Sequence, residues 1–143
     1  MGVIMQVDER HKEIIAKKWK YLIGIDEAGR GALAGPVAVG LVMWKVNNWS
    51  EIKKFLKAYP TGKDSKKLTP KQRNFWFAKI EELEKLGLMG KRVALVSNKV
   101  IDKKGISFAI KQGIEKCLIK LEIEKKETLV VIVTGKQIGR AHV

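Results

Sequence analysis

An acidic pair, Asp26 and Glu27, directly follows the apolar run at residues 21–25 and precedes a glycine-rich turn. The run is typical of a strand that is buried on both faces. Two carboxylates at the end of such a strand are costly to keep ionised unless a cation or hydrogen-bond donors compensate their charge. Carboxylate oxygens are ligands that hard divalent cations such as Mg²⁺ prefer, so the pair is a candidate metal site.

The adjacency of the two acids limits how they could share one ion. Successive residues of a strand point to opposite faces, so sharing requires that the strand ends or kinks between Asp26 and Glu27, or that one residue binds through its backbone carbonyl. Gly29 and Gly31 would supply this freedom through positive φ angles and would let a ligand backbone approach closely. Arg30 could hold a phosphate in a bidentate fork. An ordinary acidic turn that closes a strand explains the same residues, and the spacing alone leaves both interpretations open.

A second segment, residues 63–70 with the sequence KDSKKLTP, is a basic loop that opens a helix. Exposed N–H groups at the start of a helix, with lysines beside them, favour an anion. A solvated run of charges is the alternative, and it would be preferred if the acidic pair were absent.

The composition favours a polyanionic partner. The 143 residues include 29 Lys and Arg against 15 Asp and Glu, a formal net charge of +14. Each Lys or Arg that neutralises a phosphate releases a condensed counterion, so such a surplus suits nucleic acid, although charge alone does not separate an enzyme from a passive binder. The single Cys excludes a disulfide scaffold. The chain carries neither a signal peptide nor an apolar run approaching the roughly 18 residues of a membrane span, which predicts a cytoplasmic protein.

The acidic pair and the basic loop must be positioned by an α/β layer structure. Helical spacing predicts helices at residues 8–20, 49–59, 70–86 and 106–123, and apolar runs predict strands at 21–25, 37–44, 92–97 and 128–133. Thr69 is expected to cap the helix at 70–86, with Pro70 in its first turn. The first two strands are expected to pair antiparallel. The helix at 106–123 is long enough for a right-handed crossover that lays the last strand parallel to the first.

Together these segments resemble ribonuclease HII, the type 2 ribonuclease H family. Residues 21–36, YLIGIDEAGRGALAGP, are similar to the family's first catalytic strand and its turn, and residues 64–73, DSKKLTPKQR, to its second signature. Residues 96–110, VSNKVIDKKGISFAI, are similar to the segment that precedes the family's long helix. The resemblance extends over nearly all of residues 21–135.

The resemblance implies an RNase H-like mixed sheet, with strands 1–3 antiparallel and strand 4 parallel, flanked by helices and incomplete at the C-terminus. It implies a monomeric endoribonuclease that cuts the RNA strand of RNA–DNA hybrids, or single ribonucleotides embedded in duplex DNA. Mg²⁺ or Mn²⁺ on four carboxylates would activate the attacking water and leave 5′-phosphate ends. The residues that match the family's motifs are Asp26 and Glu27 as catalytic metal ligands, Gly29, Arg30 and Gly31 as sensors of the ribose 2′-hydroxyl, and Ser65, Lys66 and Lys67 near the duplex backbone.

The chain departs from the family pattern at its end. Thr134 stands where the resemblance implies the third carboxylate, and no Asp or Glu follows Glu127. Residues 138–143 resemble translated adapter sequence. We therefore expect an N-terminal helical extension at 1–20, a partial catalytic domain at 21–137 and a non-native tail at 138–143, in a fragment that is itself inactive.

Two other classes of function stay open. A catalytically silent nucleic-acid-binding module would keep the basic surface and the turn at residues 29–31 without a full carboxylate set. A basic scaffold protein of a ribonucleoprotein would explain the charge but not the acidic pair. Thr134 discriminates between the enzyme and the silent module, because a hydroxyl cannot supply the charge that a hard dication needs.

Overall fold

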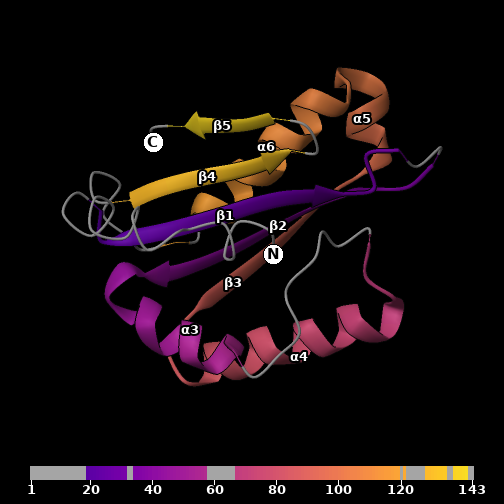
Figure 1. The fold of residues 1–143 in the computed structure, drawn as a ribbon. Coiled ribbons are helices and arrows are strands. Elements are labelled where there is room, and N and C mark those ends of the chain that lie inside the picture. The colour runs from indigo at the N-terminus through magenta and orange to yellow at the C-terminus, as the bar shows by residue number, and fades with distance from the viewer. Residues whose placement is uncertain are drawn as a thin grey trace.

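A five-stranded mixed sheet forms the centre of the computed structural model, which describes residues 19–31, 34–57, 67–119, 121, 128–134 and 137–141. The strand order is β3-β2-β1-β4-β5 (Figure 1). β1 pairs antiparallel with β2 and β2 with β3, whereas β4 lies parallel to β1, and β5 pairs antiparallel with β4. The strands are β1 (Tyr21–Ala28), β2 (Val37–Lys45), β3 (Gly90–Val96), β4 (Thr128–Thr134) and β5 (Gln137–Ala141).

Helices cover both faces of the sheet (Figure 1). The helices α3 (Trp49–Lys57) and α4 (Pro70–Lys85) lie on one face, and α6 (Ile106–Ile119) lies on the other. A 3-10 helix, η1 (Val46–Asn48), leads from β2 into α3, and α5 (Asn98–Lys104) leads from β3 into α6. β1 therefore runs through the middle of a three-layer arrangement.

Alternation along β1 divides the core between these two faces. Leu22 packs with Trp44 and Trp76 in the cluster on the side of α3 and α4. Ile23 and Ile25 are buried in the other cluster, which includes Cys117 of α6. Because side chains of a strand alternate between faces, the even-numbered residues of β1 face α4 and the odd-numbered ones face α6.

The start of α4 agrees with its prediction. Thr69 Oγ1 accepts a hydrogen bond from the Gln72 amide at 3.2 Å, and Gln72 Oε1 accepts one from the Thr69 amide at 2.9 Å. This reciprocal capping box satisfies two amide donors that have no partner within the helix, and Pro70 occupies the first turn where no amide is needed. Residues 67–69 therefore lead into a fixed helix start.

The predicted α/β fold with a mixed sheet is confirmed, and several boundaries differ from expectation. β1 extends to Ala28 instead of ending at residue 25. The helix predicted at 106–123 ends at Ile119, and a separate helix, α5, precedes it. Gly105, at a φ of 87°, separates the two helices. β5 was not predicted, because its sequence, QIGRA, lacks apolar alternation.

Most of the predicted helix at 8–20 lies outside the described residues, as do residues 63–66 of the basic loop. None of the helices in the described ranges is long and apolar enough to cross a bilayer.

Candidate active site at the end of β1

The acidic pair lies within β1, near its C-terminal end. Asp26 pairs with Gly40 of β2 and Glu27 pairs with Val39, and the register continues without a break to Ala28. The strand therefore neither ends nor kinks between the two acids. By the alternation of β1, Asp26 faces the side of α4 and Glu27 faces the side of α6.

Asp26 lies on an open part of the sheet. Asp26 is exposed. Its partner in β2, Gly40, pairs in turn with Val93 of β3, so Val93 lies on the same face of the sheet, and it is 67% exposed. Asp26 Oδ1 also accepts a hydrogen bond from the Glu27 amide at 2.9 Å. The carboxylate is thus oriented by its own backbone and accessible to a large ligand.

Glu27 is covered and holds the following turn. Its side chain is only 7% exposed, and its Oε1 lies 3.3 Å from Nη1 of Arg30, whose side chain is 52% exposed. A nearly buried carboxylate requires such a partner. This contact leaves the rest of the Arg30 guanidinium facing solvent, where it could meet a phosphate.

The two glycines of the turn differ. Gly29 has a φ of 90°, and a Cβ at this position would lie 3.0 Å from the Pro36 carbonyl oxygen. Gly29 is therefore required by the turn itself. Gly31 does not adopt the positive φ that glycine permits, and a Cβ there would meet nothing within 4 Å.

The strand beside β1 brings Thr134 to the same end of the sheet. The parallel register of β1 and β4 pairs Ile25 with Ile132, so Thr134 follows Ile132 by two residues just as Glu27 follows Ile25. The position that the resemblance assigns to a third carboxylate thus lies at the same end of the sheet as the acidic pair, on the strand beside β1, and holds a threonine.

The donor atoms of the acidic pair suit a divalent metal, but the described residues offer too few ligands to hold one. Asp26 supplies a carboxylate oxygen and Glu27 a backbone carbonyl oxygen, both hard donors. Within the described ranges, no group of three His, Cys, Asp or Glu side chains could hold a metal ion. The described residues alone therefore do not complete a metal site.

Of the three basic-loop residues, only Lys67 can be placed. It is exposed, two residues before the Thr69 cap of α4. Ser65 and Lys66 lie outside the described residues, and their roles remain predictions.

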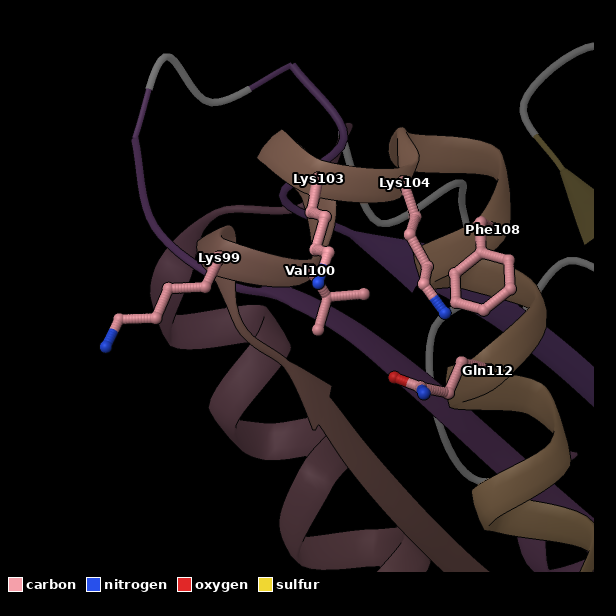
Figure 2. Close-up of a pocket in the computed structure, with 6 residues that line it drawn as sticks. All are labelled: Lys99, Val100, Lys103, Lys104, Phe108 and Gln112. Atoms are coloured by element: carbon pink, nitrogen blue, oxygen red, sulfur yellow. The ribbon is translucent and has the colours of Figure 1, made fainter.

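A basic groove that was not predicted from the sequence lies between α5 and α6. It has a volume of about 210 Å³ and is lined by Lys99, Val100, Lys103, Lys104, Phe108 and Gln112 (Figure 2). The signal in the sequence was the three lysines among seven residues at 98–104, but their grouping depends on the helix break at Gly105.

Comparisons with known proteins agree with this fold. The family model for ribonuclease HII matches residues 23–141. Ribonuclease HII from Sulfurihydrogenibium sp. is 35% identical over 117 residues, which are 81% of this chain and 52% of that protein. This chain therefore spans about half the length of that relative.

Solved structures give the same result. The ribonuclease H2 from Pyrococcus horikoshii matches with a TM-score of 0.56 and 27% identity, over 78% of this chain and 49% of that one. The RNase HII of a PCNA:RNase HII complex from Archaeoglobus fulgidus matches with a TM-score of 0.51 and 25% identity, over 82% of this chain and 52% of that one. The family match over most of the chain, together with the shared fold, shows that this chain belongs to the ribonuclease HII family.

Proposed function

We propose that the protein is a metal-dependent endoribonuclease that cuts the RNA strand of RNA–DNA hybrids, or single ribonucleotides embedded in duplex DNA. The observation that carries this proposal is an exposed carboxylate, Asp26, three residues before the glycine-rich turn and its solvent-facing Arg30. Membership of the ribonuclease HII family supports it. The net charge of +14 suits a nucleic-acid substrate.

The proposed reaction is hydrolysis of a phosphodiester. A water oxygen forms a bond to phosphorus, the bond between phosphorus and the 3′ oxygen breaks, and the proton lost by the water is balanced by one gained by the departing 3′ oxygen. The products are a 3′-hydroxyl and a 5′-phosphate. Mg²⁺ or Mn²⁺, when bound, would supply positive charge that activates water and stabilises the departing oxygen.

The residues of this chain have separate roles in the proposal. Asp26 and Glu27 would hold the ion, Asp26 through its side chain. Arg30 would bind a phosphate with its guanidinium group. The Glu27 carboxylate would hold that group in place through its contact with Nη1 of Arg30. At Gly31 an added Cβ would meet nothing within 4 Å, which leaves room for the sugar whose 2′-hydroxyl distinguishes RNA from DNA.

The chain as it stands holds two of the four carboxylates that the resemblance implies, so we propose that it does not incise alone. The protein encoded by the intact locus, acting as a cytoplasmic monomer, would supply the others. Ser65, Lys66 and Lys67 would then contact the duplex backbone.

Incision of a duplex with one ribonucleotide tests the proposal. The 143-residue chain and the protein encoded by the independently resequenced locus are each incubated with Mg²⁺ or Mn²⁺, and products are resolved on a denaturing gel. We expect incision by the second protein only, and none by its Asp26→Asn variant. Asn keeps the oxygen that accepts the Glu27 amide, so this variant removes charge without removing the hydrogen bond.

A catalytically silent nucleic-acid-binding module is the second candidate. Thr134 at the end of β4 favours it, because the missing charge should weaken metal binding. Duplex binding without incision by the protein from the resequenced locus, with Thr134 retained there, would support this candidate and contradict the enzyme.

A further inference from the structure

The basic groove between α5 and α6 lies at the end of the sheet that carries the acidic pair. β3 ends at Val96, which pairs with Val37 at the start of β2. Ala28 of β1 pairs with the next residue of β2, Ala38. Because α5 begins two residues after Val96, it lies beside the turn that follows β1, as both views show (Figures 1 and 2).

The groove concentrates positive charge over an apolar floor. Figure 2 shows Lys103 extending toward Val100, and Lys104 toward the ring of Phe108. The Lys104 Nζ lies 4.5 Å from the centre of that ring, and Phe108 is 39% exposed. Among the described residues, no carboxylate forms an ion pair with Lys99, Lys103 or Lys104.

A purely structural role explains only part of this arrangement. Lys103 and Lys104 occupy the last turn of α5, where cations interact favourably with the helix dipole. Lys99, in the first turn of α5, also lines the groove, and Figure 2 shows its side chain extending away from those of Lys103 and Lys104. Charge that has no ion-pair partner among the described residues favours an anionic ligand from outside.

We propose that this groove binds a backbone phosphate of the nucleic-acid duplex, at a nucleotide other than the one that is cut. The choice of a duplex rests on the proposed function. The acidic pair and the groove lie at the same end of the sheet, so a duplex held at Asp26 can extend to the groove. Lysine ammonium groups bind phosphate as point charges and carry no sequence preference, as a nuclease acting on any sequence requires.

The test measures duplex binding in EDTA, so that incision plays no part. A fluorescein-labelled duplex with one ribonucleotide is titrated with the 143-residue chain by fluorescence anisotropy at several KCl concentrations. Lys103→Gln with Lys104→Gln is compared with Lys45→Gln with Lys54→Gln. The two control lysines are exposed and lie at the other end of the sheet. Lys45 is the last residue of β2, and Lys54 is in α3. Both variants lose two charges, so their net charges are equal.

We expect the groove variant to flatten the plot of log K against log [KCl] by about 1 in slope, because each lost phosphate contact removes about 0.9. The control variant should keep the slope of the unaltered chain. Lys103→Gln alone, which leaves the contact between Lys104 and Phe108 intact, should give about half the change. Circular dichroism melting checks that each variant is folded.

Equal slopes for the groove and control variants would overturn the proposal, as would absence of duplex binding by the unaltered chain. Unchanged duplex binding by the groove variant would reassign the groove to another anionic partner, such as an acidic protein. Since no incision is measured, a groove effect with no nuclease activity in any form of the protein would contradict the proposed function and leave this inference standing.

Discussion

Asp26 and Glu27 are neighbours in the chain, yet their side chains lie on opposite faces of β1. Asp26 is exposed on the side of α4, whereas the Glu27 side chain is 7% exposed and contacts Arg30. The unbroken register through Ala28 excludes a strand end or kink between them. Of the arrangements that could let them share one ion, the geometry leaves the Asp26 carboxylate combined with the backbone carbonyl of Glu27.

Thr134→Asp should create a stronger metal site in this chain. The substitution places a carboxylate at the end of β4, next to the end of β1. We expect Mn²⁺ binding to tighten by roughly tenfold or more, because ligand charge tunes the affinity of oxygen-ligand sites over several decades. Isothermal titration calorimetry with MnCl₂ measures the change.

The matched control for this metal site is Thr134→Asn, which has a similar shape and no charge. The double variant Asp26→Asn with Thr134→Asp should lose the gain. Equal tightening in the Asn and Asp variants would show that Thr134 does not lie at a metal position.

The glycines of the turn should separate stability from ligand access. Gly29→Ala should destabilise the fold by about 1–2 kcal/mol, since a left-handed backbone is strained for residues with a Cβ. Gly31→Ala should change stability by less than about 0.5 kcal/mol, as other unstrained surface substitutions do. Urea denaturation measures both.

Gly31→Ala should nevertheless weaken binding of a duplex that contains a ribonucleotide, because its methyl group occupies space that the ligand needs. Anisotropy titration measures this, with an all-DNA duplex as the reference. Unchanged affinity for both duplexes in a folded Gly31→Ala variant would remove Gly31 from the interface.

Gly113 is required by close packing of α6 on the sheet. A Cβ at this position would lie 2.5 Å from Cγ2 of Val39, a fully buried residue. Overpacking of this kind costs about 1–3 kcal/mol, which exceeds or offsets the roughly 1 kcal/mol that Ala gains over Gly in a helix. Gly113→Ala should therefore fail to stabilise the protein, and thermal unfolding should show a lower Tm.

Val39→Ala provides the check on this clash. The double variant should be more stable than the sum of the two single effects predicts, because Val39→Ala removes the methyl group that the new Cβ meets. Simple additivity would place the effect of Gly113→Ala elsewhere.

Thr69→Ala should loosen the start of α4. The loss of the hydroxyl that accepts the Gln72 amide should cost about 1 kcal/mol. Thr69→Ser keeps the hydroxyl and should stay within a few tenths of a kcal/mol of the original stability, on the same helix-cap scale. Urea denaturation of the original protein and the two variants measures these differences. Equal unfolding midpoints for all three would show that Thr69 does not stabilise α4 as a cap.

The sequence by itself determined where the central strands and α4 begin, and it identified Asp26 and Glu27 as candidate metal ligands. Apolar runs at 21–25, 37–44 and 128–133 predicted the central strands, and Thr69 with Pro70 predicted the start of α4, because strand alternation and helix capping are local properties of the chain. The motif at 26–31 indicated the family, and the candidate ligands with it.

Only the tertiary structure decided which groups lie together. β1 continues past the acids because β2 pairs with it through Ala28, and this places Asp26 and Glu27 on opposite faces of the sheet. The break at Gly105, which separates α5 from α6, groups the lysines of the groove. These features depend on contacts between residues distant in the chain, and on a φ angle that glycine permits but does not dictate.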